Sequence, residues 1–492
     1  MKATTEISHS ERCVVYLTLI AGILLAWLPL LGRTLAVADD FDFVCVIRQG
    51  GPMSYFHAFG FWRPLGHYLP IWVFMQNPAV HPLLVLATHG TVVILFFHVC
   101  RALFGGLRLP FGAALAVAMA PCAFEAFNWT IAYNNITPVP FFLANLLLLI
   151  YCGKSGRSPF LLFGLSALLA LLSVLGHECL FFAVAFSGLF ALIEPVEPLS
   201  SSRKKDLRSH GWLVLAPGIG CAVWVVLFYT FPGPSVPKHI EAIHPMSLVS
   251  VYARQYSLLD VFVPWFSPVT RHLLFASWNL PLAAGMGLCA ALFFLGLCRV
   301  SGWEEENVDF RRGQWRSLIA IVALLLGGSL IYVMGGGFSL DSRKKYSLIV
   351  LMLLLAGWIC RAVVRRRLSA GAFFTAVSLL SVGAAMTAWL LVDIWKYESR
   401  RYNDLADFIV EHHLSGPVHI IENPDLAMAW PQECRSLAYR FDSAETLKPA
   451  LTFRGGAPIV DDNNDDDGAP VIEYDPQTGK WALGPLPPSP KP

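Results

Sequence analysis

Charged residues are scarce in this chain: Asp, Glu, Lys and Arg make up 14% of its 492 residues, and the formal net charge is +2. A protein that binds nucleic acid carries a basic surface, so this composition argues against that class. The 11 cysteines include no Cys-x-x-Cys pair, which argues against a disulfide framework and against a clustered thiolate metal site. A Gly-x-x-x-x-Gly-Lys-Ser/Thr loop is absent as well, which excludes a nucleotide site of that type.

Apolar residues, in contrast, make up 55% of the chain, and the mean hydropathy is +0.56. The runs that predict membrane helices lie at 14–36, 81–103, 110–126, 136–153, 159–176, 179–194, 211–231, 273–298, 316–335, 347–363 and 372–392. Since about 20 residues cross a bilayer, we expect an all-α polytopic membrane protein with about 11 transmembrane helices.

The basic residues follow the positive-inside rule. With the N terminus in the cytoplasm, the inside segments hold clusters at 203–208 and 361–367. Residues 1–12 precede the first apolar run without a clear cleavage site, so we expect an uncleaved signal anchor. We therefore predict a multi-pass inner (plasma) membrane protein with a cytoplasmic N terminus and an extracytoplasmic C terminus.

The sequence divides into three parts. Residues 1–393 form the predicted transmembrane domain, with a long first external loop at 37–80. Residues 394–455 predict a small extracytoplasmic α/β segment, because an amphipathic helix at 402–412 precedes a short apolar strand at 418–421. The acidic and proline-rich tail, 456–492, predicts disorder.

Three carboxylates, Asp39, Asp40 and Asp42, follow the first apolar run. Carboxylates at a membrane surface, within reach of a cation, form a candidate acid–base site. The alternative is that they only end the helix and face water. The topology places the other polar clusters of the chain on the same side, which favours the acid–base hypothesis.

Within the first loop, Trp62-Arg63-Pro64-Leu65 opens a second amphipathic stretch that runs to about Phe74. A proline suits the first turn of a helix that lies in the membrane interface. The guanidinium of Arg63 can hold a phosphate or a carboxylate with two parallel hydrogen bonds. Snorkelling toward the headgroups explains Arg63 equally well.

Polar residues at the ends of other apolar runs are predicted to lie on the same, extracytoplasmic side of the membrane. Glu125 lies in the last turn of a predicted membrane helix, where an ionisable residue is costly and is a functional candidate. Asn134 and Asn135 offer donors and acceptors for sugar hydroxyls, although they suit a turn as well. His177 and Glu178 are candidates to orient an acceptor, to bind a metal or to cap a turn.

A divalent metal is not required by this sequence. His177 and Glu178 by themselves offer too few ligands. Metal dependence stays open only because Asp39 and Asp40 can converge on this pair, so no metal ligand is assigned.

Arg343, Lys344 and Lys345 form the one external cluster that departs from the charge bias, and Tyr346 follows them. Three cations at this surface suit either anionic headgroups in general or one lipid-linked phosphate. We predict a donor-phosphate site at these four residues, with Arg63 contributing from the first loop.

The order of these motifs resembles the membrane glycosyltransferases of C-type fold (GT-C). The resemblance is to the branch with the protein O-mannosyltransferases and the transmembrane proteins with tetratricopeptide repeats. It covers about the first 370 residues and rests on Asp39-Asp40, Trp62–Leu65, Pro121–Glu125, His177-Glu178 and Arg343–Tyr346.

The resemblance implies a polyprenyl-phosphate-linked sugar donor, a hydroxyl acceptor, transfer on the extracytoplasmic face with inversion, and a catalytic base at Asp39 or Asp40, with Asp40 preferred. It also implies a place for the protein in the cell envelope. The family's Lys-Glu before helix six is His177-Glu178 here, its Gly-Arg-x-Asp is replaced by Tyr133-Asn134-Asn135, and the repeats are missing. These departures leave the sugar and the acceptor undefined.

Two other classes of function remain. One is a transporter or flippase of a lipid-linked or anionic substrate, which would carry its polar residues near the middle of the bilayer. The other is a non-catalytic partner in polysaccharide assembly, which would bind without turnover.

Overall fold

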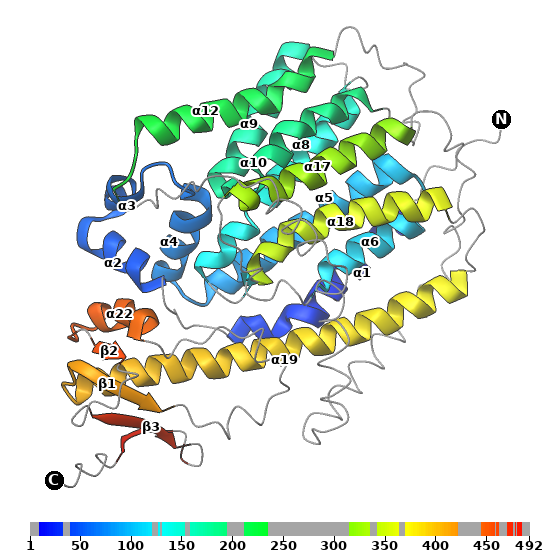
Figure 1. Ribbon diagram of the computed structural model, residues 1–492. Coiled ribbons are helices and arrows are strands. Elements are labelled where there is room, and N and C mark those ends of the chain that lie inside the picture. Colours follow the sequence, from blue (N-terminus) through cyan, green and yellow to red (C-terminus); the bar gives the residue numbers. More distant parts are fainter. Residues whose placement is uncertain are drawn as a thin grey trace, which may run out of the picture.

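The computed structural model describes residues 9–32, 40–120, 126–127, 130–152, 158–193, 211–234, 314–334, 342–363, 370–421, 444–457, 459–461, 470–475, 478 and 480–484. Within these residues the chain is mostly helical, and a small sheet lies near its C-terminal end (Figure 1). The long helices run side by side as a bundle, and the sheet packs against the end of the longest of them.

The first part of the chain forms one long helix and a group of short ones. The elements are α1 His9–Trp27 with the 3₁₀ turn η1 Leu28–Gly32, α2 Asp40–Gly50, α3 Pro52–Phe59, the π-helical turn η2 Pro64–Tyr68 and α4 Leu69–Gln76. The predicted first external loop is thus folded into helices, and the stretch after Trp62 is helical as η2 and α4, although α4 is apolar along most of its length and not clearly amphipathic.

The remaining helices make up the bundle and its connections. They are α5 Val80–Phe104, α6 Arg108–Ala118, η4 Ile131–Asn135, α8 Pro138–Tyr151, α9 Pro159–Gly176, η6 Glu178–Leu180, α10 Phe181–Phe186, η7 Ser187–Leu192, η8 Gly211–Leu215, α12 Ala216–Thr230, α17 Gln314–Met334, α18 Ser342–Val363 and α19 Ala370–Glu411.

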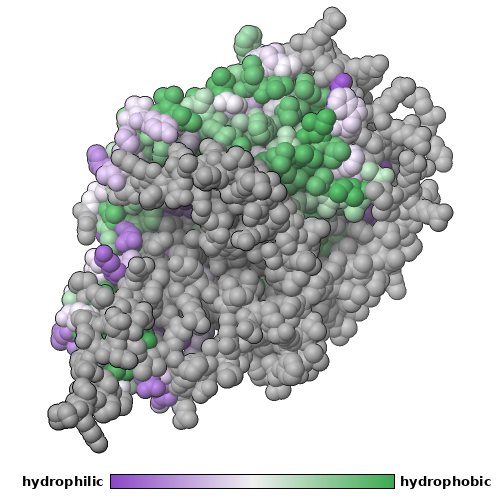
Figure 2. Space-filling view, in the orientation of Figure 1, coloured by the Kyte–Doolittle hydropathy of each residue, from purple (hydrophilic) through white to green (hydrophobic). Residues whose placement is uncertain are grey.

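Five segments of the described chain are long and apolar enough to cross a membrane: Cys13–Leu31, Val80–Phe104, Ala132–Tyr151, Pro159–Gly176 and Gly211–Thr230. The last of these leaves one apolar face uncovered, with Leu215, Ile219, Val223 and Val226 exposed at helical spacing. Figure 2 shows an apolar band over the region where Figure 1 places α12. Apolar surface of this extent suits contact with lipid, and the chain is a multi-pass membrane protein.

Helices overlap every predicted membrane segment within the described residues, whereas the predicted segment 273–298 lies outside them. Several boundaries differ from the prediction; α6, for example, ends at Ala118, eight residues before the end of the predicted segment 110–126. α18 begins at Ser342, so the cation cluster lies in its first turns and not in a loop, because arginine and lysine are good helix formers. The predicted break between 392 and 402 is wrong: α19 continues to Glu411, since no glycine or proline interrupts this stretch. The total number of spans stays a prediction.

Polar contacts join the helices inside the bundle. The Asn145 amide of α8 donates to Ser187 Oγ at 2.9 Å, and Ser166 Oγ of α9 donates to Asn145 Oδ1 at 2.7 Å. Trp389 of α19 donates from its indole nitrogen to the Leu25 carbonyl at 2.7 Å, which fixes α19 against α1. Such bonds hold apolar helices together where the hydrophobic effect between helices is weak.

The C-terminal domain, residues 402–484 as far as they are described, combines the end of α19 with the helix α22 Ala444–Phe453 and a four-stranded sheet. The strands are β1 Gly416–Ile421, β2 Ile459–Asp461, β3 Val471–Asp475 and β4 Lys480–Leu483, in the order β2-β1-β3-β4. β1 runs parallel to β2 with Gly416 opposite Ile459, and parallel to β3 with His419 opposite Val471, whereas β4 is antiparallel to β3.

β1 coincides with the expected strand at 418–421, and β2, β3 and β4 lie within the tail, 456–492, for which disorder was expected. Acidic and proline-rich composition concealed short alternating segments. In β3 the apolar residues Ile472 and Tyr474 are buried, and Trp481 of β4 packs edge-on against Tyr474 at 5.0 Å between ring centroids. Each strand is short and needs partners for stability: β2 and β3 pair with β1, and β4 pairs with β3.

Candidate functional site

Asp40 is the first residue of α2 and is fully buried, with 0% of its surface exposed. Phe43, Val44 and Ile47 follow it at helical spacing and are buried too, so one face of α2 packs into the protein. A carboxylate in the first turn also interacts favourably with the helix dipole. The hypothesis that these acids face water is therefore wrong for Asp40 and confirmed for Asp42, which is exposed. Asp39 lies outside the described residues.

Arg63 has an unusual backbone conformation just before η2, with φ 51° and ψ 46°. Few residues other than glycine adopt this left-handed conformation, so neighbouring contacts must hold it. The Tyr55 hydroxyl donates to the carbonyl of Trp62 at 2.6 Å and lies 3.3 Å from that of Arg63. Burial raises the pKa of Tyr55, so its hydroxyl stays a donor.

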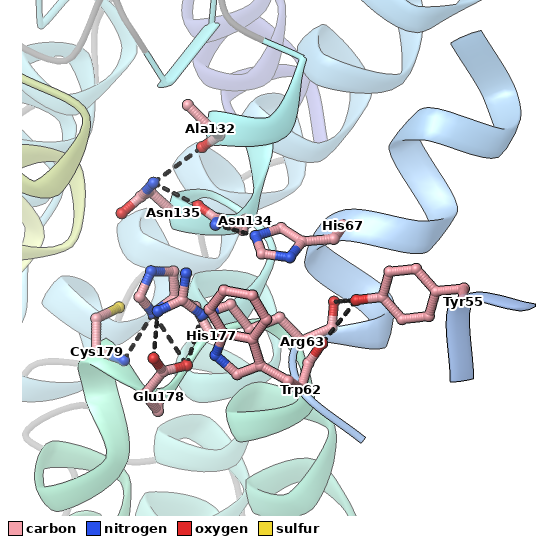
Figure 3. A network of polar contacts seen from close by, with 10 residues as sticks. All are labelled: Tyr55, Trp62, Arg63, His67, Ala132, Asn134, Asn135, His177, Glu178 and Cys179. Atoms are coloured by element: carbon pink, nitrogen blue, oxygen red, sulfur yellow. Dashed lines mark hydrogen bonds and ion pairs between the residues drawn. The ribbon is translucent and has the colours of Figure 1, made fainter. Parts of the chain in front are cut away.

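The side chain of Arg63 forms a bidentate ion pair with Glu178, the first residue of η6, which follows α9 (Figure 3). Arg63 Nε donates to Glu178 Oε2 at 2.7 Å, and Nη2 donates to Oε1. Burial by itself raises the pKa of Glu178, but the guanidinium outweighs it and holds that pKa well below its usual range. Glu178 is therefore an anion here, and Arg63 is engaged by a carboxylate of the protein.

His177 caps the turn that carries Glu178. Its Nδ1 accepts the backbone N–H of Cys179 at 2.9 Å and lies 3.6 Å from Glu178 Oε2. Of the hypotheses for this pair, the capped turn describes His177 best. No group of three or more His, Cys, Asp or Glu side chains within the described part of the chain could hold a metal ion.

A directed chain of hydrogen bonds runs from η4 to η2. Asn135 Nδ2 donates to the Ala132 carbonyl and to Asn134 Oδ1, and Asn134 Nδ2 donates to His67 Nε2 at 2.6 Å (Figure 3). Both partners of the Asn135 amide nitrogen are oxygen acceptors, which fixes the orientation of that amide. Because Nε2 accepts, neutral His67 carries its proton on Nδ1.

The other end of this chain is an acceptor. Asn135 is 2% exposed, and among the described residues its Oδ1 accepts no hydrogen bond. Figure 3 shows this oxygen pointing away from Asn134 and His67. A buried carbonyl oxygen without a donor costs about 1–3 kcal/mol, and a ligand hydroxyl would remove that cost.

Tyr346 lies inside the bundle. Its hydroxyl is 2.7 Å from His89 Nδ1, and the other ring nitrogen of His89 is 3.0 Å from the Ala118 carbonyl. α18 also contacts η4, so the beginning of α18 lies close to the segment that carries Asn134 and Asn135. The side chains of Arg343, Lys344 and Lys345 lie outside the described residues, as does Glu125.

The structure thus joins Arg63 to Glu178 and Asn134 to Asn135, and it places Asp40 one turn before Phe43, whose ring is 4.9 Å from that of His67. Tyr346, in contrast, is buried inside the bundle and not at its surface. The sequence analysis missed His67 and Tyr55. The only signal for His67 was its place four residues after Arg63, and a histidine among aromatic residues is not distinctive.

No protein-family model matches the chain, and no curated protein matches it. Among solved structures, the arabinofuranosyltransferase AftD from Mycobacteria is 16% identical, with a TM-score of 0.41, over 85% of this chain and 31% of that chain. ArnT from Cupriavidus metallidurans in the apo state is 13% identical, with a TM-score of 0.39, over 96% and 94%. The Archaeoglobus fulgidus oligosaccharyltransferase tethered with an acceptor peptide is 13% identical, with a TM-score of 0.41, over 92% and 64%. This chain therefore spans less than two thirds of the first and third of these proteins.

Proposed function

We propose that the chain is a membrane glycosyltransferase of GT-C type that transfers a sugar from a polyprenyl-phosphate donor to a hydroxyl acceptor on the extracytoplasmic face. The observation that carries the proposal is the burial of Asp40 one turn before Phe43, whose ring meets His67, a member of the polar contacts that join three separate connections of the bundle. The first loop supplies Arg63 and His67, η4 supplies Asn134, and the turn after α9 supplies Glu178.

Asp40 is the proposed base. The acceptor oxygen attacks the anomeric carbon of the sugar, the bond from that carbon to the phosphate oxygen breaks, and its electron pair leaves with the polyprenyl phosphate. The acceptor proton passes to the Asp40 carboxylate as the sugar develops positive charge, and the resulting carboxylic acid loses that proton to water before the next turnover. Attack opposite the departing phosphate inverts the anomeric centre.

The departing phosphate needs positive charge, which we assign to Arg343, Lys344 and Lys345 at the beginning of α18. The earlier assignment of Arg63 to the same phosphate is less favourable, because Nε and Nη2 already bind Glu178. We propose instead that Arg63 and Glu178 position the first loop. Tyr346 supports α18 through its contact with His89 and does not bind the phosphate itself.

We assign Asn135 Oδ1 to accept a hydrogen bond from a hydroxyl of the sugar or of the molecule that receives it. Asn134 keeps the Asn135 amide in this orientation, because its Oδ1 accepts a hydrogen bond from Asn135 Nδ2. His177 does not contact the substrates in this proposal; it caps the turn that orients Glu178. Glu125, which lies outside the described residues, remains a candidate to orient the same substrates.

The test uses purified full-length protein in lipid vesicles with synthetic polyprenyl-phosphate sugars. Release of polyprenyl phosphate that depends on an added acceptor supports the enzyme. Asp40→Asn should reduce turnover by at least about 100-fold while the donor still binds, because an amide keeps the shape but takes no proton. Asp42→Asn, two residues along the same helix and exposed, is the matched control and should keep turnover.

Three outcomes contradict the proposal. They are normal turnover in Asp40→Asn and in Asp39→Asn, movement of the donor across the vesicle without cleavage, and binding without turnover. The second outcome would indicate a transporter or flippase, and the third a non-catalytic assembly partner. Turnover that survives chelation would exclude an essential exchangeable metal ion.

A further inference from the structure

Helix α2 faces two parts of the protein at once. Asp40 and Phe43 lie on the face that packs toward η2, where the rings of Phe43 and His67 meet. Phe41, the neighbour of Asp40 in the sequence, is 6% exposed and packs against the C-terminal domain. Figure 1 shows α2 and α22 at the same end of the molecule, and the two helices are in contact.

The contact is built around the Phe41 ring. Its centroid lies 5.1 Å from that of Phe453 and 6.4 Å from that of Tyr402, and the Arg454 guanidinium lies over it at 5.1 Å. We call Tyr402, Phe453 and Arg454 the Phe41 clamp. Two turns further along α2, the Arg48 guanidinium lies over the ring of Phe453 at 4.7 Å, so the clamp holds α2 along its length.

Arg454 is itself held rigidly. Its Nε donates to Asp407 Oδ1 at 2.5 Å, its Nη2 donates to Asn403 Oδ1 at 2.7 Å, and its Nη1 donates to the Ala450 carbonyl at 3.3 Å. Asp407 and Asn403 belong to the end of α19, and Ala450 belongs to α22. A planar guanidinium with donors on every nitrogen is oriented by such bonds, and a lysine cannot reproduce them. The clamp therefore ties Phe41 to α19.

We propose that the C-terminal domain positions Asp40 for the reaction, and that Arg454 is the positioning residue, acting through Phe41 and the first turn of α2. The inference rests on the proposed function. α2 spans only 11 residues, and a helix of that length is marginal without tertiary contacts. A base must be held close to its productive geometry, and a displacement of about 1 Å can cost about 100-fold in rate.

The experiment compares Arg454→Ala with Arg401→Ala in the full-length protein. Arg401 is the matched control, because its guanidinium also lies over aromatic rings of this domain, those of Tyr474 and Trp481, each at 5.7 Å, on the sheet side. Amide hydrogen exchange of residues 40–50 and the kinetic constants for a synthetic polyprenyl-phosphate sugar are measured for each.

We expect Arg454→Ala to raise exchange across 40–50 and to lower kcat by at least about tenfold, with KM for the donor within about twofold. Phe41→Leu should do the same. Arg454→Lys keeps a cation over Phe41 but loses the paired bonds to Asp407 and Asn403, so it should fall between wild type and Arg454→Ala. Arg401→Ala should leave exchange at 40–50 and kcat unchanged.

Unchanged exchange at 40–50 in Arg454→Ala overturns the inference, and so does unchanged kcat. Equal losses in Arg454→Ala and Arg401→Ala also overturn it, because they indicate general destabilisation of the domain. Wild-type protein without turnover contradicts the proposed function instead. The exchange measurement then still decides the inference: faster exchange in Arg454→Ala alone supports the clamp, and equal exchange rejects it.

Discussion

The ion pair between Arg63 and Glu178 connects segments 115 residues apart in the sequence. Glu178→Gln should lower the free energy of unfolding by about 1–3 kcal/mol, because the guanidinium loses its anionic partner while it remains largely buried. The depressed pKa of Glu178 gives the pH dependence: the pair contributes fully above the ordinary pKa of 4.5 and loses its contribution as the pH falls below it.

The measurement is thermal unfolding of wild type and Glu178→Gln between pH 7 and pH 3. The difference in Tm should be constant at neutral pH and should shrink below about pH 4.5. Glu411→Gln, an exposed carboxylate at the end of α19, is the control and should not change Tm. A difference of the same size at pH 3 and at pH 7 would show that the charge of Glu178 is not what stabilises the loop.

Gly66 illustrates how closely the first loop packs on the bundle. A Cβ at this position would lie 2.1 Å from the Gly176 carbonyl oxygen and 2.6 Å from Asn134 Cβ. Gly66→Ala should therefore push η2 away from η4, separate His67 from Asn134, and cost about 1–3 kcal/mol of stability.

The check is Tm together with turnover, both of which should fall in Gly66→Ala. Gly164→Ala is the control, because a Cβ there meets nothing within 4 Å and alanine favours the helix α9. If Gly66→Ala matched Gly164→Ala in both measurements, close packing at this position would not matter for the site.

At the scale of elements, the proposed donor-phosphate site lies at the beginning of α18. Tyr346 and the next five residues, 347–351, are all buried, so burial does not distinguish among the three cation positions that precede them. Arg343 is our choice because a guanidinium can hold a phosphate with two parallel hydrogen bonds. Arg343→Ala should lower kcat/KM by at least about thirtyfold, because loss of a partner to a desolvated charge costs about 2–5 kcal/mol.

Lys344→Ala and Lys345→Ala serve as the comparison for Arg343→Ala. If the three residues attract only anionic lipid, each contributes about 1 kcal/mol, and the effects are equal and weakened by salt. Kinetics at low and high salt distinguish the two cases, and three equal, salt-sensitive losses would reject a specific phosphate site.

The elements differ in how well the sequence predicted them. The apolar runs predicted the bundle helices because burial in lipid demands long uniform segments, and Asp40 became a candidate because it directly follows such a run. The strands β2, β3 and β4 were missed because pairing within the sheet stabilises them: β2 and β3 pair with β1, and β4 pairs with β3. The partner of Arg63 could not be predicted either, since local patterns do not say which distant carboxylate a left-handed turn will face.

For the whole molecule, orientation in the membrane is the main open prediction. Met53 in α3 and Ser415 before β1 are exposed and should face outside, so Met53→Cys and Ser415→Cys should react with an impermeant thiol reagent on intact cells. The native Cys13 and Cys360 are exposed near the other end of the bundle and should react only after permeabilisation. Each is tested alone, with the other cysteines replaced. Reaction of Cys360 on intact cells, without reaction at position 415, would show that the orientation is opposite to the predicted one.

The continuous helix α19 spans 42 residues, or about 63 Å. It bonds to Leu25 through Trp389 at one level and meets Phe41 through Tyr402 at another, with no break between them. Its length therefore sets a rotational phase: one residue inserted between these positions would turn the C-terminal domain by about 100° and shift it by about 1.5 Å. Chimeras that exchange this domain need to preserve the spacing between Trp389 and Tyr402, because added turns restore the rotation only by moving the domain along the axis.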